Sequence, residues 1–337
     1  IEQSPVHTSD FKIASNRTQR HRVINLQTKI FNTSEQDLVE ASELIKGGGT
    51  LAFPTETVYG LGADATSNIA VAKIYQAKGR PSFNPLIIHC FSIDQIKAFA
   101  LWSSEAQVAA DKFWPGPLTM VLPLLPESNI SCLALAGLHT VAVRIPAHPV
   151  AQKILKLSNT PIAAPSANPS GTVSATKAEH VESRLSGKIE GIISDKASKI
   201  GLESTIISLS TEASILRFGA IGEAEISDVL GINLKKPGQD GKISAPGQLS
   251  SHYAPRGSIR LNSKTIKENE VHLGFGKVDS DLNLSKTENL IEAAANLFDF
   301  LHKLDEMGAE KIAVSPIPEE GIGIAINDRL RRAAAPK

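Results

Sequence analysis

The chain has 337 residues, of which 42% are hydrophobic and 21% are charged, and its 35 basic side chains equal its 35 acidic ones. This composition is typical of a globular protein with more than one domain, and it argues against a nucleic-acid coat protein. No apolar run approaches the roughly 18–20 residues that a membrane helix needs. Cys90 and Cys132, in no metal-ligand spacing, indicate a reducing compartment with two structural thiols.

Residues 1–30 show little periodicity and contain several basic side chains. We predict a frayed tail here, with the remnant of a transit peptide as the alternative. We expect a cytoplasmic protein. Organellar targeting stays open, because the sequence begins with Ile1 rather than Met.

Regular periodicity then predicts alternating helices and strands. Residues 32–35 are typical of a helix start, and the glycines at 47–49 are typical of its end. A buried strand at 51–53 precedes an amphipathic helix that starts near residue 69 and closes at Gly79, ahead of Pro81. Further strands are predicted at 86–88, 118–122, 141–145, 162–164, 191–194, 205–209 and 215–217, and further helices at 93–99, 106–113, 150–157 and 177–185. This alternation predicts an α/β domain with a mixed sheet.

Apolar periodicity fades between residues 233 and 257, where prolines and glycines accumulate, so this segment is predicted to be a linker. Beyond it, strands at 271–273 and 312–314 and helices at 290–304 and 322–332 predict a small α/β domain. The expected organisation is a tail at 1–30, a catalytic domain at 31–232, a linker or lid at 233–257 and a C-terminal domain at 258–337.

One window of this neutral chain carries charge of a single sign. No Asp or Glu occurs between Asp64 and Asp94, whereas Lys73, Lys78 and Arg80 lie inside. Cations are favoured near a helix C-terminus, which would explain Lys78 and Arg80 without any ligand. A bound phosphate would explain them too, because arginine offers it a planar fork and lysine a point charge. From this window alone both interpretations stand.

Two polar turns follow predicted strands. Residues 54–60 hold three hydroxyls and a carboxylate, and residues 165–170 hold Ser166 and Asn168. Ligands gather beyond the carboxyl ends of strands in open α/β sheets, although ordinary turn chemistry would also place such residues here. The chain has no glycine-rich phosphate loop, no HExxH and no paired CxxC. A bound nucleotide is therefore expected to be held by scattered side chains.

Seven motifs in order resemble the YrdC-type threonylcarbamoyl-AMP synthases. They are FPTETVYGLG, KGRPSFNPLIIH, FWPGPLT, VAVRIP, APSANPSG, LESTII and ILRFGAI. Residues 244–256 and the predicted C-terminal domain resemble the longer, two-domain form of that family. The resemblance implies a YrdC-like twisted open mixed sheet with flanking helices, plus a smaller Rossmann-like α/β C-terminal domain.

The resemblance also implies a reaction. L-threonine, bicarbonate or carbon dioxide, and ATP would give L-threonylcarbamoyl-adenylate and pyrophosphate, with Mg²⁺ as cofactor. The downstream tRNA threonylcarbamoyl transferase machinery would then use the product to modify tRNA. A weak tRNA contact and no membrane association are further expectations.

Three groups of site residues follow from the matched motifs. The residues implied around threonine are Thr57, His89, Arg144, Ala164 and Ser204. The residues implied around ATP are Lys78, Arg80, Asn84, Thr140, Ser166, Asn168, Ser174 and Arg217. Lys78 and Arg80 are also the implied catalytic pair, Tyr253 is the implied lid residue, and no metal ligand is expected directly from the protein.

Elementary electrostatics is consistent with these roles. The threonine carboxylate needs a fixed cation, which Arg144 would supply, and a dry pocket would keep the threonine amine neutral. The carbamate anion must then approach an anionic phosphate, and Lys78 and Arg80 with Mg²⁺ would offset that repulsion. No single general base is evident, so we expect positioning and electrostatics to carry most of the rate.

Two other functions are weighed against this one. A double-stranded-RNA or tRNA-binding protein without ATP turnover would suit a basic groove, but the neutral net charge and the 5% aromatic content count against it. A related carbamoyl-adenylate enzyme of hydrogenase maturation would use carbamoyl phosphate. The absence of acylphosphatase and zinc-finger regions argues against that alternative.

Overall fold

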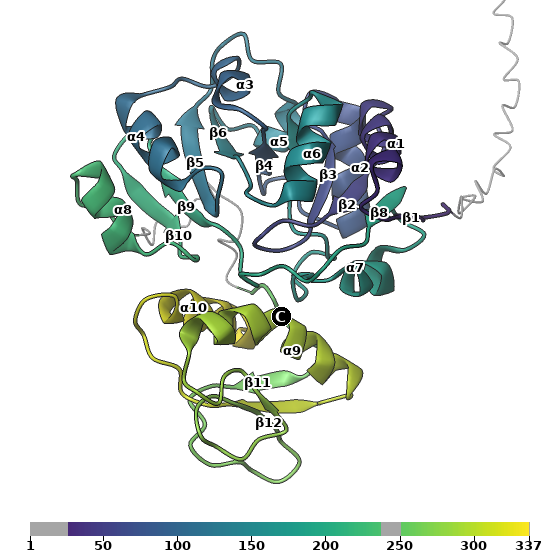
Figure 1. Ribbon diagram of the computed structural model, residues 1–337. Helices are drawn as coiled ribbons and strands as arrows, with labels where there is room; N and C mark the ends of the chain where they lie inside the picture. Colours follow the sequence, from purple (N-terminus) through teal and green to yellow (C-terminus); the bar gives the residue numbers. More distant parts are fainter. Residues whose placement is uncertain (1–25, 237–250, 337) are drawn as a thin grey trace, which may run out of the picture.

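A ten-stranded and a four-stranded sheet organise the chain, which a computed structural model describes over residues 26–236 and 251–336 (Figure 1). We call the part around the first sheet the large unit and the part around the second sheet the small unit. Most of the predicted tail, residues 1–25, and most of the predicted linker, residues 237–250, lie outside the described residues. The predicted domain limits stay predictions.

The large sheet is mixed, as predicted. Its strands in chain order are β1 (Lys29–Phe31), β2 (Leu51–Phe53), β3 (Gly60–Asp64), β4 (Ile87–His89), β5 (Leu118–Pro123), β6 (Thr140–Arg144), β7 (Ile162–Ala163), β8 (Gly191–Ile193), β9 (Thr205–Ser208) and β10 (Ser214–Arg217). Their spatial order is β1-β8-β2-β3-β7-β4-β6-β5-β9-β10. The central strand β6 runs parallel to β4 and antiparallel to β5, so both pairing modes meet in the middle of the sheet.

Helices cover both faces of this sheet. Along β2, Leu51 and Phe53 join one apolar cluster and Ala52 joins the other, because successive side chains of a strand point to opposite faces. One cluster is completed by α1 (Glu35–Lys46) and α6 (Pro149–Ser158). The opposite face carries α2 (Asn68–Lys78), α3 (Ile93–Lys97), α4 (Ser104–Phe113), α5 (Cys132–Leu135), α7 (Ala178–Leu185) and α8 (Glu223–Leu230).

The helix ends follow the local signals in the sequence. The Ser34 side chain accepts a hydrogen bond from the Asp37 backbone N–H and caps α1. Gly79 ends α2 with a φ of 57°, a left-handed conformation that glycine adopts without a Cβ clash. The predicted start of the first helix and the predicted end of the second are therefore confirmed.

The small unit is a four-stranded sheet with two helices. Its strands are β11 (Ser258–Arg260), β12 (Val271–Gly274), β13 (Leu282–Asn283) and β14 (Lys311–Val314), in the order β11-β14-β12-β13 and parallel throughout. Its helices are α9 (Leu290–Glu306) and α10 (Gly323–Ala334), which Figure 1 shows on the side of this sheet that faces the large unit. The predicted Rossmann-like α/β character is confirmed.

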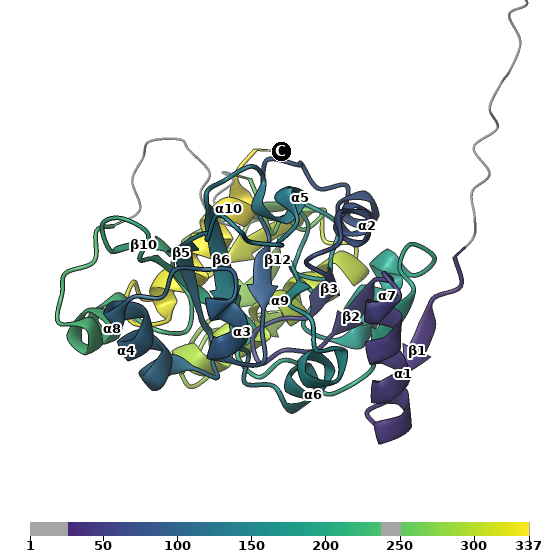
Figure 2. The same ribbon diagram turned by 90° about the horizontal axis from the view of Figure 1, so that it is seen from above.

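The two units share apolar packing. Val58, Val173 and Leu202 of the large unit are buried in the same cluster as the core of the small unit. Seen from above, the large unit overlies α9 and α10 (Figure 2). The loops that carry these three residues therefore rest on the small unit.

The remaining predicted elements are confirmed with shifted ends, but several elements were missed. Strand β3 has the sequence GLGAD, which lacks an alternating apolar pattern. Gly62 is required in it because a Cβ there would lie 2.6 Å from the Phe53 ring. Strand β1 was also missed; it pairs with β8 and crosses the predicted boundary between the tail and the catalytic domain, with Lys29 and Ile30 on one side and Phe31 on the other. The other missed elements are β11, β13, α5 and α8.

No helix in residues 26–236 and 251–336 is long and apolar enough to cross a membrane.

Candidate active site

A polar pocket lies where strand ends and loops of the large unit approach the segment before the small unit. It is lined by Thr55, Thr57, Val58, Tyr59, Gly60, Arg80, Ile87, His89, Arg144, Ala164, Pro165, Ser166, Glu203, Ser204, Arg217, His252 and Tyr253. The predicted site residues that the structure brings together here are Thr57, Arg80, His89, Arg144, Ala164, Ser166, Ser204, Arg217 and Tyr253. Residues separated by almost two hundred positions in the chain thus share one cavity.

The other predicted site residues do not line this pocket. They are Lys78, Asn84, Thr140, Asn168 and Ser174. The Lys78 ammonium donates to the backbone carbonyl of Ser166 at 2.5 Å and to that of Asn168. Asn84 is fully buried, and neither polar atom of its side chain has a partner among the described residues. Thr140 starts β6 and Arg144 ends it, so the two lie on the order of 13 Å apart along the strand.

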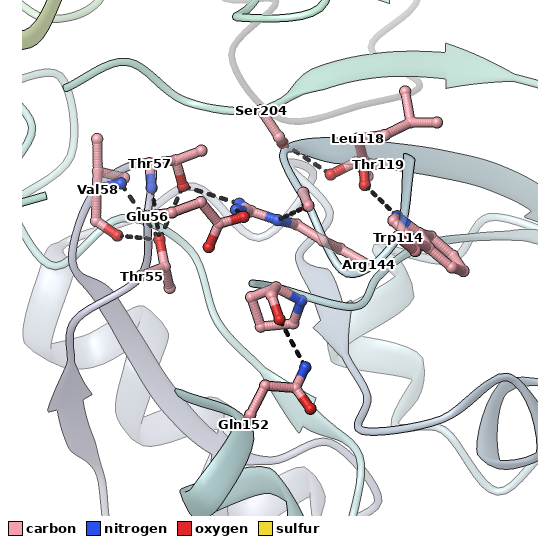
Figure 3. A network of polar contacts seen from close by, with 12 residues as sticks. Thr55, Glu56, Thr57, Val58, Trp114, Leu118, Thr119, Arg144, Gln152 and Ser204 are labelled. Carbon is pink, nitrogen blue, oxygen red and sulfur yellow. Dashed lines mark hydrogen bonds and ion pairs between the residues drawn. The ribbon is translucent and has the colours of Figure 1, made fainter. Parts of the chain in front are cut away.

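Arg144 is fixed by three hydrogen bonds. Its Nε donates to the Gly116 carbonyl at 3.1 Å, and its Nη1 donates to the Thr57 hydroxyl at 2.9 Å. Its Nη2 donates to Glu56 Oε1 at 2.5 Å, as Figure 3 shows. Burial is the largest single influence on the pKa of Glu56 and tends to raise it, but the charge and hydrogen bond of Arg144, together with backbone hydrogen bonds, lower that pKa overall. Glu56 is therefore an anion that orients the guanidinium, a role that the sequence reasoning did not assign.

The turn that carries Thr57 is organised by its own hydroxyls. Thr55 Oγ1 donates to the Val58 carbonyl at 2.6 Å and lies 2.8 Å from Thr57 Oγ1 (Figure 3). Side-chain bonds of this kind fix the backbone of turns that follow strands. These hydroxyls shape the turn locally, and the Ile200 backbone N–H, which donates to the Glu56 carbonyl at 2.9 Å, ties it to a distant segment.

His89 ends β4 directly beside Arg144, because the two residues are register partners on adjacent strands. Burial and the charge of Arg144 lower the pKa of His89 to about 3. The imidazole is consequently neutral near pH 7, and it adds no charge to the pocket.

Buried cations dominate the rest of the site. Arg80 is 9% exposed and donates to the backbone carbonyls of Asn84 at 3.2 Å and Pro85 at 2.9 Å. Burial lowers the pKa of Arg80 to about 10, which leaves it charged at neutral pH. Arg217 donates to the Ser204 carbonyl and hydroxyl, each at 3.0 Å. The Asn84 and Pro85 carbonyls thus hold the Arg80 guanidinium inside the pocket wall.

Glu203 is a buried acid in the pocket wall that sequence reasoning missed. Its Oε1 accepts from the Ser174 hydroxyl at 2.6 Å, and its Oε2 accepts from Arg329 Nε at 2.9 Å. Burial is the largest single influence on its pKa and tends to raise it, but the charges of Arg329 and Arg217, together with the hydrogen bonds from Ser174 and Arg329, lower that pKa overall. The available signal was its place beside Ser204 in the LESTII motif. Arg329 had no such signal, because it lies 126 residues further along the chain.

Tyr253 connects the pocket wall to the small unit. It is buried, and its ring stacks on Phe298 of α9 with centroids 5.4 Å apart. The Arg329 guanidinium lies 5.3 Å from the Tyr253 ring, within the range of a cation–π contact. In this conformation the predicted lid residue therefore rests against the small unit.

Within residues 26–236 and 251–336, no three His, Cys, Asp or Glu side chains gather in a way that would hold a metal ion. Glu203 in the pocket wall is paired with Arg329, and Glu56 is paired with the pocket residue Arg144.

Known proteins resemble this chain along most of its length. A family profile described as "Telomere recombination" matches residues 43–219, and one described as "Threonylcarbamoyl-AMP synthase, C-terminal domain" matches residues 221–335. The threonylcarbamoyl-AMP synthase of Pyrococcus abyssi is 40% identical over 93% of this chain and 97% of its own length. That of Bacillus subtilis is 39% identical over 91% of this chain and 95% of its own.

A solved structure is similar as well. The crystal structure of Pyrococcus abyssi Sua5 complexed with L-threonine superposes with a TM-score of 0.84 at 38% sequence identity. The match covers 91% of this chain and 98% of that one. Both sheets are therefore shared with a protein whose complex with an amino acid is known.

Proposed function

Because this chain belongs to the two-domain threonylcarbamoyl-AMP synthase family, we propose that its pocket condenses L-threonine, bicarbonate and ATP into L-threonylcarbamoyl-adenylate and pyrophosphate. The observation that carries the proposal is the buried set of cations around a neutral histidine and a hydroxyl-rich turn. Arg80, Arg144 and Arg217 all line one cavity, which suits substrates that are all anionic or carry a carboxylate.

Arg144 is the proposed partner of the threonine carboxylate. A guanidinium has five N–H groups, and Glu56, Thr57 and Gly116 engage three of those of Arg144. The remaining donors suit a carboxylate, and Ser204 lines the same pocket. Neutral His89 would accept a hydrogen bond from the threonine. The crystal structure of the Pyrococcus abyssi protein with L-threonine supports this choice of amino acid.

The proposed chemistry has two steps. The neutral threonine amine attacks the carbon of bicarbonate and expels water, which leaves a carbamate anion. A carbamate oxygen then attacks the α-phosphorus of ATP, and the bond to the leaving pyrophosphate breaks. Both steps benefit from a pocket that excludes water, because burial disfavours the ammonium form of the amine. Exclusion also protects the mixed anhydride from hydrolysis.

The cations on the other side of the pocket are the proposed partners of ATP. Arg80 and Arg217 line the pocket, and Lys78 lies behind it on the carbonyls of Ser166 and Asn168. The fixed charges of Arg80 and Arg217 offset the repulsion between the carbamate and the phosphates, and they stabilise the departing pyrophosphate. Burial and the charge of Arg80 lower the pKa of Lys78 well below its ordinary value, so Lys78 is assigned a positioning role on these carbonyls.

Mg²⁺ is proposed to enter with ATP rather than on protein ligands. Mg²⁺ prefers carboxylate and phosphate oxygens, and both carboxylates near the pocket are engaged by arginines. When bound, the ion would neutralise phosphate charge. Transfer of the product to the tRNA threonylcarbamoyl transferase machinery, a weak tRNA contact and a cytoplasmic location remain predictions.

Pyrophosphate release tests this function. Purified protein with ATP, Mg²⁺ and bicarbonate should release pyrophosphate only when L-threonine is added. Reactions without bicarbonate or with L-alanine in place of threonine serve as controls. Release that does not depend on threonine would contradict the proposal. Tight, salt-sensitive RNA binding without ATP turnover would instead favour the RNA-binding alternative.

A further inference from the structure

The small unit holds the Ser174 backbone directly through His302 and its hydroxyl indirectly through Glu203. The Ser174 side chain is fully buried, and its hydroxyl donates to Glu203, which Arg329 of α10 holds in turn. Its backbone carbonyl lies 3.1 Å from Nε2 of His302 on α9, which donates to it. Two helices of the small unit thus converge on one serine of the large unit.

Arg329 is fully buried, and each of its nitrogens has a partner. Its Nε donates to Glu203 at 2.9 Å, its Nη2 to the Phe218 carbonyl at 2.9 Å, and its Nη1 to Asp328 at 2.8 Å. Phe218 directly follows Arg217, and Glu203 directly precedes Ser204. Arg329 therefore joins two loops, each of which carries a pocket residue.

We propose that Arg329 and His302 of the small unit are positioning residues for the nucleotide, because together they fix the orientation of Ser174. This inference rests on the proposed function and on the ATP contact that the resemblance implies for Ser174, which in this structure is buried outside the pocket lining. It assigns the small unit a part in the reaction itself, although neither Arg329 nor His302 lines the pocket.

Adhesion between the two units does not require the Arg329–Glu203 pair. Val58, Val173 and Leu202 already bury apolar surface against the small unit. A fully buried ion pair is a weak source of stability, because desolvation of both charges offsets most of their attraction. What the pair does provide is a fixed direction for the Glu203 carboxylate, which faces the pocket.

The direction of the Glu203 carboxylate decides whether the Ser174 hydroxyl acts as a hydrogen-bond donor or acceptor toward other groups. A serine hydroxyl has one proton, and Ser174 gives it to anionic Glu203. Towards a ligand the hydroxyl can then act only as an acceptor. If Glu203 turned away, Ser174 could present its proton instead, so the position of Arg329 decides which nucleotide groups Ser174 favours.

Arg329→Lys tests the proposal, because lysine keeps the charge and loses the planar fork. We expect the KM for ATP to rise at least tenfold while the KM for threonine stays within twofold. The matched control is Arg331→Lys on the same helix, where a 53% exposed side chain pairs with Glu319. That variant should equal the wild type in both constants. Equal rises of both KM values in Arg329→Lys, or no rise, would overturn the proposal.

A double-mutant cycle with Ser174→Ala shows whether Arg329 acts through Ser174. In the Ser174→Ala background, Arg329→Lys should change the KM for ATP by less than twofold. Additive effects would contradict the inferred route. If Arg329→Lys does not fold, His302→Asn keeps the ion pair, and the same rise in the KM for ATP is expected. An unchanged constant there would count against the proposal.

Nucleotide binding separates this inference from the proposed function. A titration with a non-hydrolysable ATP analogue, without threonine, should show weaker binding to Arg329→Lys than to the wild type. If the wild type releases no pyrophosphate, the proposed function fails, and this titration still decides on Arg329. If the wild type is active and both proteins bind the analogue equally, the inference fails alone.

Discussion

The two sides of the pocket are held in place by different parts of the chain. On the proposed threonine side, Arg144 is fixed by Glu56, Thr57 and Gly116, all within the large unit. On the proposed nucleotide side, Glu203 is fixed by Arg329 of the small unit. The hydrogen bonds that fix Arg144 therefore lie within the large unit, whereas the bond that fixes Glu203 forms only when the two units meet.

This difference gives the small unit a specific role. Its contacts should govern how the nucleotide is held and should leave the amino-acid side largely unchanged. Substitutions on the two sides should consequently separate in the KM values for the two substrates. The following variants test that separation.

Arg80→Ala should have the largest effect. Removing a buried cation from the nucleotide side should reduce kcat by about 10³-fold, or about 4 kcal/mol of transition-state stabilisation. Steady-state pyrophosphate release measures this loss, and a thermal melt checks that the variant is folded. The matched control is Lys73→Ala in the same acid-free window, where Lys73 forms a half-exposed pair with Glu190. Equal activity of the two variants would contradict the role of Arg80.

Arg144→Lys should have the next largest effect, and this effect should fall on threonine rather than on ATP. Lysine cannot offer two parallel hydrogen bonds to a carboxylate, so kcat/KM for threonine should fall by about 100-fold, or about 2.7 kcal/mol. The KM for ATP should stay within twofold of the wild type. Titration of each substrate at saturating levels of the other gives both constants. A variant that loses affinity for ATP instead would contradict the assignment of Arg144 to the threonine side.

Acid should destabilise the folded chain through its buried histidines. The pKa values of His89, His252 and His302 are each lowered to about 3, and burial is the largest cause in all three. The ordinary pKa of histidine is about 6.5, so the unfolded chain binds more protons than the folded chain below that value. The stability that these neutral histidines contribute is present above about pH 6.5, and it is lost as pH falls toward 3, by up to about 1.4 kcal/mol per pH unit for each.

His302→Asn tests this dependence at the contact between the units. The His302 ring stacks on that of His180 with centroids 3.9 Å apart, and Arg184 and Asp299 also act on its charge. Denaturant unfolding at pH 7.5 and 5.5 should show a smaller loss of stability for the variant than for the wild type. Equal losses would mean that His302 does not remain neutral in the folded chain.

Lys303→Gln should have the smallest effect. Lys303 is 43% exposed and lies 3.0 Å from Asp299, which also accepts from Lys177 of the large unit at 2.6 Å. Exposed pairs contribute roughly 0–1 kcal/mol, so stability should change by less than about 0.5 kcal/mol. Both KM values should be unchanged in pyrophosphate-release assays. A marked change in the KM for ATP would mean that charged contacts remote from Ser174 also act on the nucleotide.

The sequence predicted the threonine side better than the nucleotide side, for a physical reason. Thr57 and Arg144 each lie at or just beyond a buried strand, and strand ends in one sheet converge. Glu203 and Arg329 meet across 126 residues, and neither has a local pattern that indicates a buried partner. A pair of this kind becomes visible only once the two units are packed together.

Short elements were missed because packing rather than local propensity creates them. Strand β3 depends on Gly62, which leaves room for the Phe53 ring of the neighbouring strand. The acid-free window between Asp64 and Asp94 was likewise not resolved by local sequence alone. Its residues alone left helix-end chemistry and phosphate binding equally open, whereas the structure pairs Lys73 with Glu190 and buries Arg80 in the pocket wall.

A crystal structure with L-threonine and a non-hydrolysable ATP analogue tests the two-sided pocket most directly. We predict the threonine carboxylate within hydrogen-bond distance of Arg144. We predict the nucleotide in contact with Arg80 and Ser174, with the bond between Arg329 and Glu203 intact. A nucleotide bound on Arg144, or one that leaves Ser174 without a contact, would contradict this account.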